Sequence, residues 1–331
     1  MNTDPVPSTE WKERIAPDEA ERYAQFATQF AEIQARKSKR FGNGRTLHRK
    51  QLAAAHGTLE VLDGLPHYAH FGLFAIPHDY EVWVRLSNGG VDKAPDKMPD
   101  IRGFALRVLG VRGNSALGNG PAVSQDFTLI NQEAFAFAGS TEFVEFVVAA
   151  SQGNGHLLKY LVRKHGLLGV PGQLGKMIKV VKKPFTGFAT ETLFSALPMA
   201  NGPYAVRVRL VPSTANGKPE SGAQNDWSAD FAARLRKGPL HWDMQLQFFA
   251  SEQLTPIEDA SVNWTTPYST VARLMLPQQD LDAPDAKAFA ERVEGSVIDP
   301  WQALVEHRPL GDVQRARKVV YFRSQKGRGA T

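Results

Sequence analysis

Two residues near the C-terminal end, Arg317 and Tyr321, have the types and the spacing to hold a metal ion. Residues four apart share one face of a helix, so a helix over 313–328 would direct the guanidinium at the phenol. A positive charge beside a phenol favours the phenolate, which binds hard ions such as Fe(III). Tyrosinate is a recognised axial ligand of haem iron. Arg328, seven residues further on, lies near the same face and could reach a haem propionate.

The same spacing is common in surface ion pairs, which contribute a fraction of a kcal/mol at most. The interpretation of Arg317 and Tyr321 as a metal site therefore depends on what the rest of the chain contains. Other segments of the chain must also match a metal site before this interpretation is preferred to a surface pair.

The composition is that of an ordinary globular protein, with 331 residues, 42% hydrophobic and 22% charged. There is no cysteine, which excludes disulfides, thiolate ligands and cysteine nucleophiles and is compatible with a reducing compartment. The net charge of +5 is too modest to indicate nucleic-acid binding. We see no secretory signal and no run of eighteen apolar residues, so the expected location is cytoplasmic.

Polar and apolar residues alternate in several segments, as they do in half-buried antiparallel strands. The clearest are 81–87, 204–211, 241–250 and 268–276, and the segment 71–76 also has strand character. Helical spacing marks 10–40, 141–150 and 313–328. The pattern predicts an α+β fold with an antiparallel sheet or barrel. We expect a helical arm over 1–45 and a single core domain over 46–331.

A basic stretch stands apart between residues 156 and 188, where leucines alternate with lysines and arginines. Pro171 is expected to split it into two helices. A helix of this kind can lie on an anionic membrane surface. The commoner role is to bury its apolar face in the body of the protein, and both interpretations stay open.

Five segments, in order along the chain, resemble the catalase superfamily, and three others, 255–259, 277–280 and 307–311, resemble in particular its branch of small, single-domain catalase-related haem peroxidases. Each motif is weak alone, and their order carries the resemblance. The segments are His56-Gly57, Arg85-Leu86-Ser87, Asp100-Ile101-Arg102-Gly103-Phe104-Ala105, 126–131 with the later Phe143, and Arg317 to Tyr321. The resemblance implies a catalase-like antiparallel β-barrel with surrounding helices.

The resemblance also implies a haem b cofactor and the residues that bind it. Tyr321 would be the iron ligand, supported by Arg317. Arg85 and Arg328 would pair with the propionates, and Phe143 would pack on a haem face.

On the opposite haem face the resemblance implies three catalytic residues. His56 would accept and return the peroxide proton, which an imidazole can do near neutral pH. Asn131 would donate a hydrogen bond to the peroxide, and Ser87 would orient the imidazole.

One departure concerns Ala53, three residues before His56, where catalases carry an arginine for a propionate; Arg45 or Arg49 would have to replace it. The chain also lacks the long wrapping segments of full catalases. The resemblance therefore implies haem and peroxide chemistry more firmly than efficient dismutation of H2O2.

The function expected from these residues is a haem peroxidase that reduces H2O2 or an organic hydroperoxide, such as a fatty-acid hydroperoxide, with electrons from a second donor. One alternative is a hydroperoxide isomerase or dehydratase that resembles allene oxide synthase, and another is a haem-binding protein without catalysis. The expected partners are the peroxide, an electron donor, a membrane surface through 156–188 and further copies of the chain in a homo-oligomer.

Overall fold

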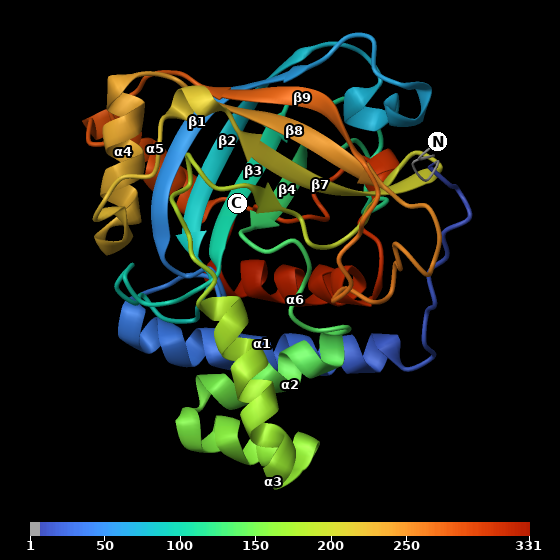
Figure 1. Ribbon diagram of the computed structural model, residues 1–331, viewed down its shortest axis with the longest axis vertical. Coiled ribbons are helices and arrows are strands. Elements are labelled where there is room, and N and C mark those ends of the chain that lie inside the picture. The colour runs from blue at the N-terminus through green and yellow to red at the C-terminus, as the bar shows by residue number, and fades with distance from the viewer. Residues whose placement is uncertain (1–6) are drawn as a thin grey trace.

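The protein is built on an antiparallel β-barrel with helices gathered mainly beyond one end of it (Figure 1). A computed structural model describes residues 7–331. Within that range the strands are β1 Gln51–Val61, β2 Asp79–Asn88, β3 Arg102–Leu109, β4 Ser124–Ile130, β5 Leu193–Phe194, β6 Met199–Asn201, β7 Tyr204–Pro212, β8 Leu240–Phe248 and β9 Tyr268–Leu276.

Eight of these strands close into a ring, as the sequence led us to expect. The order is β5-β4-β3-β2-β1-β9-β8-β7, and β5 pairs with β7 to complete the circle, while β6 adds to β7. A closed barrel leaves no exposed strand edge, which removes the main route to edge-to-edge association.

The period-two alternation of the strands decides which side chains fill the barrel. In β2, Val82, Val84 and Leu86 are buried in the interior core. The residues between them, including Arg85 and Ser87, therefore point outward. This outward face of the β1–β4 wall is where the helices pack and where polar side chains can meet a ligand.

The α-helices in the described residues are α1 Glu19–Phe41, α2 Ser140–Ser151, α3 Asn154–Val181, α4 Trp227–Lys237, α5 Pro284–Gly295 and α6 Asp312–Arg328. Short 3₁₀ helices are η1 His67–Ala69, η2 Gly72–Phe74, η3 Thr214–Asn216, η4 Ala223–Asn225 and η5 Val305–His307. None of the helices described is both long and apolar enough to cross a membrane.

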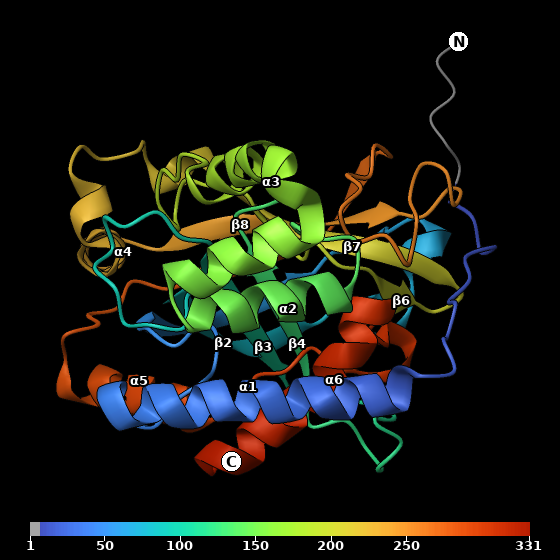
Figure 2. The ribbon, with the colours of Figure 1, turned by 90° about the horizontal axis from the view of Figure 1, so that it is seen from below.

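Helices α1 and α6 lie side by side beyond the end of the barrel, although they are almost 300 residues apart in sequence (Figures 1 and 2). Tyr23 donates a hydrogen bond of 2.7 Å to Asp312, and Gln34 donates one of 3.1 Å to the carbonyl of Ser324. The N-terminal helix is thus fixed to the C-terminal helix that carries Arg317 and Tyr321.

Three sequence predictions were wrong in detail. The segment 71–76 contains the 3₁₀ helix η2 in place of a strand, and the first helix begins at Glu19 and not near residue 10. The break in the basic stretch falls at Gly166, not at Pro171, because Gly166 takes φ 69°, a left-handed conformation that glycine adopts without steric cost.

A buried carboxyl on β4, Asp126, predicts an unusual dependence of stability on pH. Its Oδ2 accepts a hydrogen bond of 3.0 Å from the backbone N–H of Asp299, and Arg107 lies 3.9 Å from Oδ1. Burial raises the pKa of Asp126 to about 7, against the opposing charge of Arg107. Because the folded pKa is raised, this carboxyl favours folding below pH 4 and loses that contribution as the pH rises through 7.

Replacing Asp126 by asparagine, which is neutral at every pH, should remove this loss. Between pH 5 and pH 8 we expect the free energy of unfolding of the wild type to fall by about 3 kcal/mol relative to the variant. Urea unfolding at both pH values measures it, with the exposed Asp79→Asn as the matched control. An equal change in wild type and Asp126→Asn would show that Asp126 is ionised in the native state throughout.

Candidate functional site

A large cavity lies between the outward face of the barrel wall and helices α1, α2 and α6. Its empty volume, including the part that is open to solvent, is about 1340 Å³. Apolar side chains form much of the wall. The apolar lining includes Phe30, Leu47, Ile130, Phe135, Phe143, Val144, Leu197, Ile298, Val313 and Val320.

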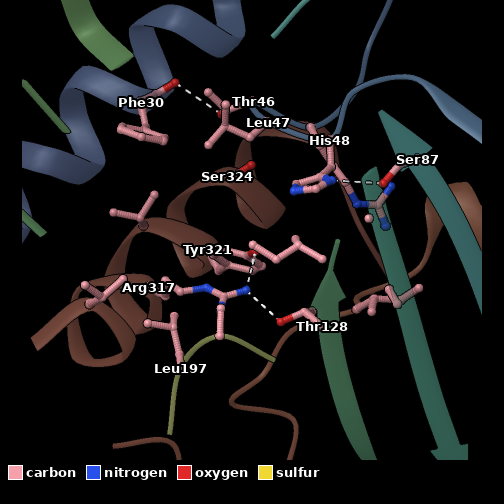
Figure 3. Close-up of a pocket in the computed structure, with 18 of the residues that line it drawn as sticks. Phe30, Thr46, Leu47, His48, Ser87, Thr128, Leu197, Arg317, Tyr321 and Ser324 are labelled. Atoms are coloured by element: carbon pink, nitrogen blue, oxygen red, sulfur yellow. Dashed lines mark hydrogen bonds between the residues drawn. The ribbon is translucent and has the colours of Figure 1, made fainter. Parts of the chain in front are cut away.

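On the helix side of the cavity, Arg317 and Tyr321 are in contact, as the spacing four residues apart requires. Arg317 Nη2 donates a hydrogen bond of 2.8 Å to the phenol oxygen of Tyr321 and one of 2.9 Å to Thr128 Oγ1 (Figure 3). Gln314 accepts a further bond of 3.1 Å from Nη1. The guanidinium is therefore fixed between α6 and β4, with the phenol oxygen beside its positive charge.

On the barrel side of the cavity stands a histidine that our sequence analysis did not select, His48. Its Nδ1 lies 3.0 Å from Ser87 Oγ, and the other end of the ring points into the cavity (Figure 3). Arg85 Nη2 donates a hydrogen bond of 2.8 Å to the His48 carbonyl, and the His48 N–H donates one of 2.9 Å to the carbonyl of Gly89. Side chain and backbone of His48 are both held in place.

The backbone of His48 is strained, which is unusual for a residue with a side chain. His48 has φ 51°, and the other non-glycine residue with positive φ in the described chain is Ala196, at φ 56°. Both residues line the same cavity. Such conformations cost free energy and persist where the surrounding structure enforces them, most often at functional sites.

Burial keeps His48 neutral. Burial, together with the positive charges of the nearby Arg85, Arg317 and Arg45, lowers the pKa of His48 to about 3. A neutral imidazole has one ring nitrogen free of a proton. Because Nδ1 is engaged with Ser87, Nε2 is the nitrogen available to a molecule in the cavity.

Three arginines gather at the rim of the cavity around one carboxylate. Glu294 Oε2 lies 3.0 Å from Arg45 Nη1 and 2.8 Å from Arg85 Nε, while Arg328 Nη2 donates to the carbonyl of Ser296 at 2.7 Å. Burial lowers the pKa of both Arg45 and Arg328, and the charge of Arg85 lowers both further. One carboxylate cannot balance three guanidinium groups, so the rim favours an anionic group.

The structure does not bring His56 to this cavity, which corrects the choice of His56 as the proton-transferring residue. His56 is exposed on β1, where its ring packs against Phe289 of α5. It pairs across the sheet with Trp83, four residues along β2 from Ser87, or about 13 Å at the rise of a strand. Ser87 therefore orients His48 and cannot reach His56.

Asn131 is also absent from the cavity wall. It is buried, and its Oδ1 accepts a hydrogen bond of 2.8 Å from the backbone N–H of Arg102. Its role in the structure is to join the ends of β3 and β4. Ser87, Arg85, Arg328 and Phe143 do line the cavity with Arg317 and Tyr321.

The sequence contained a signal for His48 that the analysis did not use. Arg45 stands three residues before His48, the spacing of the propionate arginine that is missing before His56. Thr128, which fixes Arg317, and Phe30, from the N-terminal helix, had no comparable signal because only the fold brings them to the cavity.

Gly103, in the Arg102-Gly103-Phe104 segment, is required for the close approach of His48 to the barrel wall. A Cβ at this position would lie 2.5 Å from His48 Nδ1 and 2.8 Å from Ser87 Oγ, closer than atoms can pack. We expect Gly103→Ala to displace the imidazole, to cost about 1–3 kcal/mol of stability, and to reduce any turnover that depends on His48 at least about tenfold.

Thermal unfolding and a peroxide assay measure the effect of Gly103→Ala. Gly155→Ala is the matched control, because its added Cβ would meet no atom within 4 Å and it should leave both quantities unchanged. Full activity in Gly103→Ala would contradict the placement of His48 against Gly103.

The fold is that of catalases of known structure. A fungal catalase superposes with a TM-score of 0.67 at 16% identity over 89% of this chain and 61% of its own. A bacterial catalase superposes with a TM-score of 0.64 at 15% identity, over 100% of this chain and 64% of its own. Catalase A from Saccharomyces cerevisiae superposes with a TM-score of 0.63 at 14% identity, over 100% of this chain and 69% of its own. The chain thus spans less than two thirds of the first two.

No family model and no curated protein sequence matches the chain. The similarity is therefore one of structure, at identities that show the fold alone. The chain has a catalase-like fold, a closed antiparallel barrel of eight strands with helices around it.

Proposed function

We propose that the protein is a haem peroxidase with Tyr321 as the iron ligand and His48 as the residue that moves the peroxide proton. One observation carries the proposal: a phenol held by an arginine and a neutral imidazole held by a serine face the same apolar cavity. The catalase-like fold supports it, because Ser87, Arg317 and Tyr321, which the resemblance to catalases singled out, all line the cavity.

The residues present fit a haem on three counts. The phenol oxygen of Tyr321 is a hard donor suited to Fe(III) and is fixed by a hydrogen bond of 2.8 Å from Arg317 Nη2. The apolar walls suit a flat macrocycle, and the rim with Arg45, Arg85 and Arg328 suits two carboxylates. Haem iron, when bound, supplies the redox chemistry that cleaves a peroxide O–O bond.

The side chains around the peroxide would handle its proton. His48 Nε2, which is free of a proton when Nδ1–H donates to Ser87 Oγ, accepts the proton from one peroxide oxygen and returns it to the other, which leaves as water or an alcohol. Ser87 keeps the ring in the orientation that this transfer needs. A peroxidase cycle consumes one hydroperoxide, two electrons from a donor and two protons, giving an alcohol and water.

The apolar wall of the cavity is also compatible with a second reaction, the dehydration of a fatty-acid hydroperoxide. Phe30, Leu47 and Val144 suit a hydrocarbon chain better than free H2O2. A fatty-acid hydroperoxide bound there could instead lose water to give an epoxide, which consumes no donor. Binding of haem without catalysis is the third alternative.

The three functions separate in one experiment on the haem-loaded protein. Each of H2O2, cumene hydroperoxide and a fatty-acid hydroperoxide is supplied with and without a reducing dye, and the products are analysed. We expect formation of the alcohol that depends on the dye. An epoxide formed equally well without the dye would replace the peroxidase proposal by the dehydratase, and no consumption of any peroxide would leave haem binding alone.

A further inference from the structure

Helix α3 follows α2 and projects away from the barrel (Figure 1). Helix α3 doubles back at Gly166, so its two halves form a hairpin. One side of this hairpin packs on α2 through a small apolar cluster of Ala149, Tyr160, Leu161 and Val170. The projection therefore has a core of its own, and its other side chains are left facing outward.

The bend of the hairpin exposes two adjacent leucines. Leu167 is 76% exposed and Leu168 98% exposed, directly after Gly166. Leu158 and Ile178, on the two arms of the hairpin, are each about half exposed. Single exposed apolar residues are ordinary, but adjacent exposed leucines at the end of a projection indicate a surface that binds a protein or a membrane.

The sequence of the hairpin carries positive charge and no negative charge. Residues 154–183 contain seven lysines and arginines and no aspartate or glutamate. Lys164 pairs with Glu145 of α2 at 3.1 Å, whereas Lys159, Arg163 and Lys182 are exposed. The partner of this surface must therefore combine an apolar interior with negative charge at its boundary.

We propose that Leu167 and Leu168 insert into an anionic phospholipid bilayer while the exposed lysines and arginine bind its headgroups. A bilayer offers both properties in the required order, with anionic headgroups outside and hydrocarbon within. A second copy of this chain is a poor partner for this surface, because two such hairpins would bring their positive charges together and repel each other. The contact is peripheral, since no described helix can cross a membrane.

The projection is joined to the cavity wall. Phe143 and Val144 of α2 line the cavity, whereas Phe146 and Ala149 of the same helix pack on α3. Gln132 donates a hydrogen bond of 3.0 Å to the carbonyl of Val180, and Lys183 donates one of 2.8 Å to the carbonyl of Asn131. Docking through the hairpin would place the α2 side of the cavity nearest the lipid.

Vesicle flotation of the full-length protein tests the proposal. Vesicles of phosphatidylcholine with about one third phosphatidylglycerol are compared with pure phosphatidylcholine, at about 0.1 M and about 1 M salt. We expect binding to the anionic vesicles at low salt only. No flotation of the wild type with anionic vesicles would overturn the proposal.

Variants locate the contact. The double variant Leu167→Ser with Leu168→Ser should bind at least about tenfold more weakly, because each buried leucine contributes strongly to transfer from water. Replacing Lys159 and Arg163, on the arm before the bend, by glutamine should weaken binding roughly 25-fold, at about fivefold per charge. Ile76→Ser with Val123→Ser, 72% and 63% exposed on another part of the surface, is the matched control and should bind as the wild type does.

Two further outcomes would contradict membrane docking at this place. Equal binding by the leucine variant would assign the contact to another face. A dimer of the wild type that the leucine variant loses, seen by light scattering, would make the hairpin a surface for a second copy. Haem content should be unchanged in every variant, so failure of the haem proposal remains distinguishable from failure of this one.

Discussion

Replacing His48 by asparagine is expected to lower peroxide consumption by the haem-loaded protein about 10²–10⁴-fold, the usual contribution of a positioned proton-transfer group. Asparagine is chosen because it tolerates the left-handed backbone of His48, at φ 51°, better than alanine does. Haem content should be retained, since the residue proposed to bind the iron, Tyr321, is on the other side of the cavity.

His56→Asn is the matched control for this prediction. His56 is exposed on β1 and packs on Phe289, so its loss should leave peroxide consumption and haem content unchanged. Steady-state rates with H2O2 and an organic hydroperoxide measure both variants. A large loss in His56→Asn with normal rates in His48→Asn would reverse the assignment and invalidate the geometry of the cavity.

Tyr321→Phe is expected to lower the affinity for haemin by about a hundredfold or more and to abolish turnover. Loss of a group that only supports a metal ligand typically costs 10- to 100-fold in affinity, and loss of the ligand itself should cost more. Arg317→Leu should lower the affinity for haemin by the smaller factor, about 10- to 100-fold, because Arg317 acts only through its 2.8 Å hydrogen bond to the phenol oxygen.

Haemin titration with thermal unfolding separates loss of the ligand from loss of the fold. The Tyr321 hydroxyl contacts Arg317 at the edge of the cavity, so Tyr321→Phe should change the melting temperature of the haem-free protein little. Tyr204→Phe, in an aromatic cluster away from the cavity, is the control. Unchanged haemin affinity in Tyr321→Phe would show that another residue binds the iron.

Much of the fold followed from the sequence because strand alternation is a local property. The strand 268–276 was predicted to the residue, and the pairing of Arg317 with Tyr321 followed from helical spacing alone. The 3₁₀ helix over Gly72–Phe74 was missed because a short apolar run suits a strand equally well.

The site was harder to predict because it depends on where each strand lies against the next. His56 and His48 are eight residues apart, and only the pairing of Gln51 with Ser87 shows which end of β1 meets the cavity. The role predicted for Asn131 was not supported for a similar reason, since its side chain accepts a hydrogen bond from the backbone of Arg102 and does not line the cavity. Thr128 and Phe30 reach the cavity through contacts between segments distant in sequence, which no local pattern encodes.

A haem site held by Tyr321 is tested most directly by titrating the purified wild-type protein with haemin and recording absorption spectra. We predict saturation at one haemin per chain with a high-spin ferric spectrum that differs from that of free haemin. A spectrum that remains that of free haemin throughout the titration would contradict the proposal, and would leave Arg317 and Tyr321 as a structural pair within a catalase-like fold.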